Sequence, residues 1–143
     1  MRTALWIVAL AFALEARGEL PLVELTAGMH LIKAEFANTF QARAQGLMHR
    51  EKLAQNTGML FRFDEAATQC MWMKNTLIPL SVAFLDEAGT VVTILEMQPH
   101  DETSRCSSGP ARYALEMNRA WFAERGIKPG MKLRGIDKLG PAR

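Results

Sequence analysis

The sequence predicts a single α+β domain that is compact and mainly β, with a curled mixed sheet or a small barrel and two short helices. Short runs of apolar and β-branched residues recur along the chain, and turns containing Gly, Asp or Asn separate them. Only two stretches carry helix signals, and no internal repeat is present. The length of the chain suits one domain with one hydrophobic core.

The N-terminal residues have the pattern of a secretory signal peptide. Arg2 precedes an uncharged apolar run, residues 3–14, which is shorter than the ~20 residues that a membrane-spanning helix needs. Small residues follow this run, as a cleavage site requires. We therefore expect residues 1–18 to be removed and residues 19–143 to form the domain, exported to the periplasm and without a membrane span. An uncleaved N-terminal anchor is the alternative.

The charges and the remaining residue types exclude several partners. The formal net charge is +2, and acidic and basic residues are interspersed, so no extended basic surface for nucleic acid is expected. The acidic residues and the histidine near Cys106 match no established zinc spacing. The methionines are spread through the apolar blocks, as in core packing, so copper is not expected either. The sequence predicts no metal and no cofactor.

The two cysteines, Cys70 and Cys106, are the only ones in the chain. Two cysteines in an oxidising compartment favour a disulfide between them. Closing the intervening loop would stabilise the fold by about 4 kcal/mol in the chain-entropy model. Free thiols and metal ligands are the alternatives.

The expected strands follow apolar and alternating runs. The first two form a hairpin, a turn at Asp64-Glu65 ends the third, and Pro79 bends the fourth. The residues around 70–76 alternate less clearly but are also taken as extended. The expected strands are 22–26, 29–37, 59–63, 77–85, 91–95, 112–117 and 131–133.

Each of the two expected helices follows an asparagine. Asn38 is expected to cap the first helix, residues 39–45, which Gly46 ends. Asn118 is expected to cap the second, which runs through Glu124 and ends at a glycine. The first helix is about two turns long.

Several blocks of the sequence form a recognisable set: RAQGLMHR (43–50), GMLF (58–61), WMKNTLIPL (72–80), ARYALEM (111–117) and GIKPG (126–130). Together they resemble the family called domain of unknown function 192. The resemblance implies a small α+β domain that is often exported and has no assigned activity. One position departs from the family pattern, because the residue before Trp72 is commonly aromatic there and is Met71 here.

Five residues are the candidates for a ligand-binding surface. Strand alternation would place Trp72 and Lys74 on one face, beside Asn75. Arginine binds carboxylate or phosphate, tryptophan offers a stacking face, and the amide orients a ligand. The sequence therefore predicts a non-enzymatic exported module that binds a small anionic or sugar-like ligand, or a partner protein. The other two candidates are Arg43 and Arg50.

Three alternatives stay open. In the first, these residues are structural, with Trp72 in the core, Lys74 in solvent and Arg43 paired with Glu116. In the second, the protein is an enzyme that uses the irregular segment 98–110, although no triad or pair of catalytic carboxylates is recognisable. In the third, the chain is a purely structural or interaction domain without a well-formed pocket. No catalytic residue is predicted.

Overall fold

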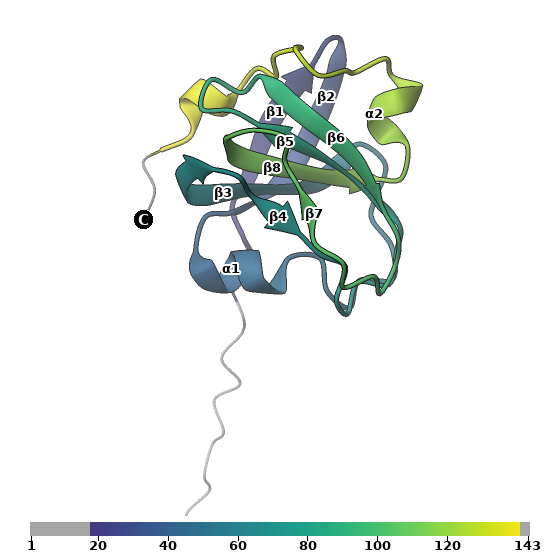
Figure 1. The fold of residues 1–143 in the computed structure, drawn as a ribbon. Helices are drawn as coiled ribbons and strands as arrows, with labels where there is room; N and C mark the ends of the chain where they lie inside the picture. Colours follow the sequence, from purple (N-terminus) through teal and green to yellow (C-terminus); the bar gives the residue numbers. More distant parts are fainter. Residues whose placement is uncertain (1–17, 141–143) are drawn as a thin grey trace, which may run out of the picture.

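The computed structural model describes residues 18–140, so the predicted signal peptide lies outside the described residues except for Gly18. In the described chain, six strands form one mixed sheet in the order β1-β2-β3-β8-β5-β6, and two short strands form a second sheet, β4-β7 (Figure 1). The elements are β1 (Leu22–Ala27), β2 (His30–Ala37), α1 (Phe40–Gln45), β3 (Thr57–Ala67), β4 (Cys70–Met71), β5 (Leu80–Leu85), β6 (Val91–Met97), β7 (Arg105–Cys106), β8 (Ala111–Asn118), α2 (Trp121–Glu124) and the 3-10 turn η1 (Ile136–Lys138).

The predicted α+β fold with a mixed sheet is confirmed, and the barrel alternative is wrong. Strands β2 and β3 pair in parallel, whereas the other neighbours in the large sheet are antiparallel. The edge strands β1 and β6 do not pair with each other, so the sheet stays open. Instead, the C-terminal segment 130–134 lies against both edges, through single bridges between Thr26 and Arg134 and between Thr90 and Lys132.

The large sheet buries apolar side chains on both faces. Alternation along β8 sends Tyr113, Leu115 and Met117 to the face that α2 and the C-terminal segment cover. Ala114 lies on the opposite face, in the apolar cluster that also contains Leu47 from the loop after α1. Strand β8 is therefore central both within the sheet and between the two apolar layers.

A glycine allows the central strands to approach each other. Gly58 in β3 pairs with Met117 in β8. A Cβ atom at position 58 would lie 2.2 Å from the carbonyl oxygen of Glu116 and 2.4 Å from the sulfur of Met117. Since real Cβ atoms do not come so close to other heavy atoms, any larger residue at position 58 would displace β8.

Both helices are placed where the sequence predicts them, but their caps differ. Thr39, rather than Asn38, caps α1, because its Oγ1 accepts a hydrogen bond of 3.1 Å from the backbone N–H of Ala42. Gly46 ends α1 as predicted, with a φ of 48°. Asn118 does not cap α2, because it still belongs to β8.

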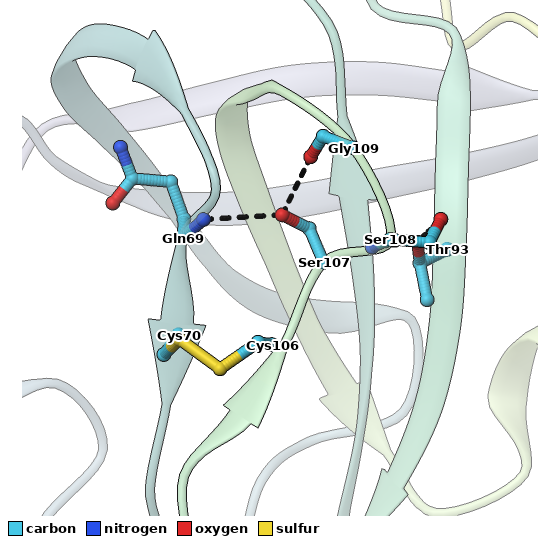
Figure 2. The surroundings of a disulfide bond; sticks show 7 residues. All are labelled: Gln69, Cys70, Thr93, Cys106, Ser107, Ser108 and Gly109. Atoms are coloured by element: carbon cyan, nitrogen blue, oxygen red, sulfur yellow. Dashed lines mark hydrogen bonds between the residues drawn. A yellow bond between two sulfur atoms is a disulfide. The ribbon is translucent and has the colours of Figure 1, made fainter.

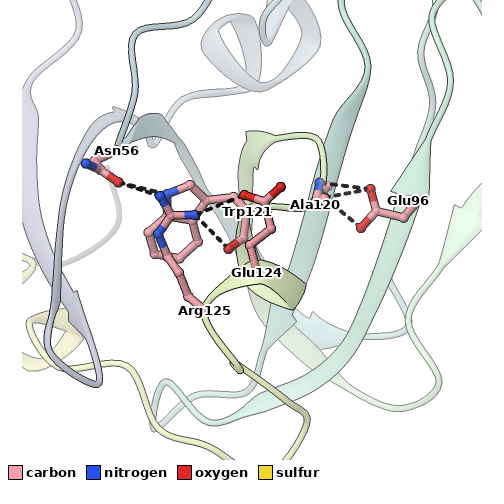
Figure 3. Close-up of polar contacts among 7 residues, drawn as sticks. Asn56, Glu96, Ala120, Trp121, Glu124 and Arg125 are labelled. Carbon is pink, nitrogen blue, oxygen red and sulfur yellow. Dashed lines mark hydrogen bonds and ion pairs between the residues drawn. The ribbon is translucent and has the colours of Figure 1, made fainter.

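Helix α2 is shorter than expected, and side chains hold it in place (Figure 3 shows these contacts). The indole N–H of Trp121 donates to Oδ1 of Asn56 at 3.0 Å, and Arg125 donates to the same atom at 3.2 Å. The Arg125 guanidinium also lies 4.4 Å from the centroid of the Trp121 ring. The backbone N–H of Ala120, before the helix, donates to Ser81 Oγ at 2.8 Å. The helix has no side-chain cap, and these contacts fix its position instead.

Four strand predictions need correction. The strand expected over 77–85 begins only at Leu80. Strand β3 continues through Asp64-Glu65 to Ala67, because its pairing with β8 resumes after an irregularity. Residues 72–76 are not a strand, since they form a turn with Asn75 at a φ of 52°. Residues 131–133 contribute a single bridge rather than a strand.

The predicted disulfide joins Cys70 to Cys106, with an S–S distance of 2.04 Å (Figure 2). The two cysteines are directly paired residues of β4 and β7. Next to them, the buried Ser107 Oγ accepts a hydrogen bond from the backbone N–H of Gln69 at 3.1 Å and donates one to the carbonyl of Gly109 at 2.7 Å. The disulfide and this hydroxyl together hold the small sheet.

Replacing both cysteines by serine should lower the free energy of unfolding by about 4 kcal/mol, because the bond closes a loop between residues 36 positions apart. Urea unfolding at neutral pH measures this change. Wild-type protein treated with a dithiol reductant is the matched control and should unfold at the same midpoint as the double variant. A loss below about 1 kcal/mol would show that other contacts already hold β4 against β7.

Candidate functional site

A cavity of about 290 Å³ lies between α1, β3 and the segment 70–76, on the face of the sheet that carries α1. Most of its lining is aromatic or aliphatic, which is typical of sites for small organic molecules. The polar side chains that reach it are few and come from different elements. The apolar residues at the cavity include Phe40, Leu47, Met48, Phe61, Phe63 and Met71.

The turn after α1 sets one wall of the cavity. Gly46 ends the helix in the left-handed region, which turns the chain so that Leu47 is buried against the sheet. A Cβ atom at Gly46 would lie 3.3 Å from Cζ of Phe61, another lining residue. Position 46 therefore favours glycine for two reasons. Other residues would be strained at this positive φ, and a side chain would crowd the Phe61 ring.

Trp72 and Lys74 form one side of the cavity mouth. Trp72 is 47% exposed, so the alternative that places it in the core is wrong. The Lys74 ammonium lies 5.3 Å from the centroid of the Trp72 ring, within the range of a cation–π contact. The two side chains share the cavity because of the turn at 72–76 and not because of strand alternation.

Backbone hydrogen bonds and the disulfide hold the segment that carries Trp72 and Lys74. The N–H of Met73 donates to the carbonyl of Asp101 at 2.7 Å, and the N–H of His100 donates to the carbonyl of Thr76 at 3.1 Å. The disulfide fixes the segment at its start (Figure 2). The irregular stretch 98–110 therefore supports the mouth from outside, and none of its side chains lines the cavity.

Arg43 lines the cavity, but its guanidinium binds groups other than Glu116. Its Nη1 donates to the carbonyl of Arg62 at 2.8 Å, and its Nη2 lies 3.3 Å from both carboxylate oxygens of Asp64. The proposed pairing of Arg43 with Glu116 is therefore wrong, and Asp64 is the partner. This arrangement leaves Lys74 as the lining cation that makes no ion pair with a carboxylate of residues 18–140.

The other two candidate residues lie outside this cavity. Arg50 makes a two-pronged contact with Glu35, with N–O distances of 2.5 and 2.9 Å, and this hydrogen bonding raises the pKa of the guanidinium. The pair borders a neighbouring cavity of about 250 Å³. Asn75 is exposed, and its carbonyl accepts a hydrogen bond from the N–H of His49 at 2.8 Å. Of the five candidates, the cavity unites Arg43, Trp72 and Lys74.

Glu116 is the residue of the cavity that sequence reasoning considered only as a partner for Arg43. It lies on the central strand β8 between Met59 and Val82 of the neighbouring strands, and it is 4% exposed. Among the described residues, no hydrogen bond or ion pair involves its carboxyl group. Burial alone raises the pKa of Glu116 to about 8. A glutamate within the apolar block ARYALEM is the signal that could have identified it.

Two further findings concern metals and membranes. Within residues 18–140, no three histidine, cysteine, aspartate or glutamate side chains come together in a way that could hold a metal ion. In the same part of the chain, no helix has the length and apolar character that crossing a membrane requires.

Glu116 should make the protein less stable as the pH rises. Between about pH 4.5 and pH 8 the folded state keeps a proton that the unfolded state has released, so stability falls across this window, by about 1.4 kcal/mol for each pKa unit of difference. Glu116→Gln should therefore match the wild type near pH 4 and exceed it by several kcal/mol at pH 9. Urea unfolding at both pH values measures this difference. Glu65→Gln, which removes an exposed carboxylate from β3, is the control and should leave the pH profile unchanged.

Comparison with solved structures places the fold among proteins without an established activity. A crystal structure of a protein of unknown function from Novosphingobium aromaticivorans DSM 12444 matches with a TM-score of 0.77 and 36% identity, over 80% of this chain and 86% of that one. A protein of Sinorhizobium meliloti 1021, provisionally described as a transcription regulator, matches with a TM-score of 0.74 and 38% identity, over 80% of this chain and 92% of that one. No curated protein matches the chain.

The family comparison agrees with the resemblance seen in the sequence blocks. The model of DUF192, which is described as an uncharacterised family, matches residues 23–135. This range includes both helices, the whole lining of the cavity and every strand residue except Leu22, the first residue of β1. The chain belongs to the DUF192 family.

Proposed function

We propose that the protein is a non-enzymatic, exported module that binds a small organic anion with an apolar body in the cavity beside α1. The observation that carries the proposal is the juxtaposition of an apolar cavity with Lys74, which makes no ion pair with a carboxylate of the described chain. An aromatic or aliphatic body would fill the space next to Phe61, and the anionic group would meet the ammonium at the mouth.

The lining favours such a ligand over a sugar. A sugar presents several hydroxyl groups, and each one that leaves water needs a hydrogen-bond partner. The cavity offers few polar side chains among many apolar ones. Trp72 suits either class, because an aromatic face packs on a ring of any kind. The shortage of polar partners therefore decides for the anion with an apolar body.

A second candidate is an enzyme that uses Glu116 as a general acid or base. A buried carboxyl group whose pKa lies near neutrality has the property that such catalysis requires. The lining contains neither a histidine nor a serine, and its cysteine, Cys70, is bonded to Cys106. We rank this candidate second, because the described lining offers no nucleophile activated by a neighbouring base.

Binding is tested by titrating isotope-labelled protein with phenylacetate, which combines a ring and a carboxylate, and following the backbone amide NMR signals. We expect the amides of Gly46, Phe61 and Trp72 to shift with saturation. Phenethylamine, with the same ring and the opposite charge, should bind at least about fivefold more weakly because Lys74 repels it. Glucose is the control for the sugar class and should cause no shifts. Tighter binding of glucose or phenethylamine would contradict the proposal.

Substitutions locate the binding site. Lys74→Gln should weaken phenylacetate binding about fivefold and Trp72→Ala about tenfold, through loss of charge and of apolar contact respectively. Both residues are exposed at the mouth, so the melting temperature without ligand should change by only a few degrees. Lys132→Gln, at an exposed lysine of the C-terminal segment, is the matched control and should bind like the wild type. Equal binding by all three variants would place the ligand elsewhere.

The proposal that the protein is exported rests on the pattern of residues 1–18 and on the disulfide, which suits an oxidising compartment. When the full chain is expressed in a bacterium with a periplasm, osmotic shock should release a protein whose intact mass begins near Glu19. Its cysteines should react with an alkylating agent only after reduction. Full-length protein retained in the cytoplasm with both thiols reactive would contradict export.

A further inference from the structure

We infer that Glu116 acts from the wall of the cavity as a neutral hydrogen-bond donor, and that it selects ligands with an acceptor oxygen, such as a carbonyl, remote from their anionic group. This inference rests on the proposed function, because it uses the same cavity. It narrows the ligand class from organic anions in general to oxo or hydroxy derivatives of such acids.

The position of Glu116 prevents its side chain from reaching bulk water around the sheet. Strand β8 is flanked by β3 on one side and β5 on the other, each of which has a further strand beyond it. On the same face, the directly paired residues are Met59 and Val82, and Ala114 precedes Glu116 by two positions. The side chain is 4% exposed and belongs to the lining of the cavity.

In the part of the chain that the structure describes, the charged groups around Glu116 make their contacts with other residues. Arg43, from α1, lines the same cavity but is bound to Arg62 and Asp64. Lys74, from the 72–76 turn, lies over the Trp72 ring.

On β2, beyond Met59, Glu35 lies in the same row of the sheet and is paired with Arg50. The residues paired with Glu116 from β3 and β5 are apolar. Thr76, which also lines the cavity, donates its hydroxyl hydrogen to the carbonyl of Lys74. Within residues 18–140, no hydrogen bond or ion pair therefore satisfies the carboxyl group of Glu116.

A buried carboxyl group without a protein partner costs several kcal/mol when it is ionised and less when it is neutral. The raised pKa of about 8 agrees with the neutral form at pH 7. A neutral carboxyl group carries one O–H donor, and native proteins nearly always satisfy such buried donors. A ligand in the cavity that presents an oxygen to Glu116 would provide this hydrogen bond.

The neutral form of Glu116 also favours a ligand that presents an acceptor oxygen over a ligand that presents a cation. An ammonium group would require Glu116 to ionise within an apolar wall, and both charges would lose their hydration. A carbonyl oxygen requires no ionisation and loses less hydration. The ligand therefore enters with its carbonyl or hydroxyl oxygen first and keeps its anionic group near Lys74, at the mouth.

Three derivatives of phenylacetate, all of similar size, test the inference. The 4-acetyl derivative carries an acceptor oxygen, the 4-isopropyl derivative has the same shape without it, and the 4-aminomethyl derivative carries a cation. In the wild type at pH 7, the acetyl compound should bind about tenfold more tightly than the isopropyl compound. Equal binding of these two, or tightest binding of the aminomethyl compound, would overturn the inference.

Two variants separate donation by Glu116 from a purely structural role. Glu116→Gln keeps an N–H donor and should retain the preference for the acetyl compound, whereas Glu116→Leu should lose it. Affinity of the wild type for the acetyl compound should fall above pH 8 toward that for the isopropyl compound, a loss of about tenfold, and the affinity of Glu116→Gln should stay constant. Identical pH profiles would show that Glu116 does not hold the ligand. The circular dichroism of each variant verifies its fold.

The outcomes distinguish failure of the proposed binding function from failure of the proposed role of Glu116. If none of the three compounds nor phenylacetate shifts the amides around the cavity, the proposed binding function fails. If the compounds shift those amides but bind equally well to the wild type and to Glu116→Leu at every pH, the binding function stands and only the role of Glu116 fails.

Discussion

The pairing of β8 with β3 and β5 is the interaction on which the rest of the structure depends. It joins the two hairpins, β1-β2 and β5-β6, into one sheet, because β3 pairs with β2 of the first hairpin and β5 is itself a strand of the second. The close approach requires Gly58, where a side chain would collide with the backbone of Glu116. The same backbone that joins the two halves of the sheet therefore places the Glu116 carboxyl group in the cavity wall. The contact between Gly58 and the backbone of Glu116 is therefore important both for the fold and for the candidate site.

Local sequence signals predict most of the secondary structure and fail where tertiary contacts decide. The two hairpins follow from apolar runs and turn residues, and Gly46 follows from its freedom at positive φ. The expected caps at Asn38 and Asn118 rest on local sequence signals, which are residue type and, for Asn38, the Gln41 three positions later. In the structure, Thr39 has the geometry that a cap requires, and pairing extends β8 through Asn118. Strand pairing depends on residues far apart in the chain, which local propensity does not describe.

The candidate site shows the same division. The prediction that Trp72, Lys74 and Arg43 bind a ligand rests on their side-chain chemistry, and all three line the cavity. Arg50 was selected for the same reason but lies with Glu35, because the parallel pairing of β2 and β3 could not be deduced from the sequence. The importance of Glu116 depends on its burial on a central strand, and strand order was not predictable. A charged residue in an apolar block indicates such a position only after the order of strands is known.

The segment 130–134 has a consequence for how the protein behaves among its own copies. Edge strands with free N–H and C=O groups act as templates on which other chains add strands, which is a common route to aggregation. This segment bonds to Thr26 on β1, and its Leu133 donates to the carbonyl of Gly89 just before β6. This short stretch therefore pairs with one end of each edge of the open sheet, so another chain could add a strand only along the remaining length of β1 or β6.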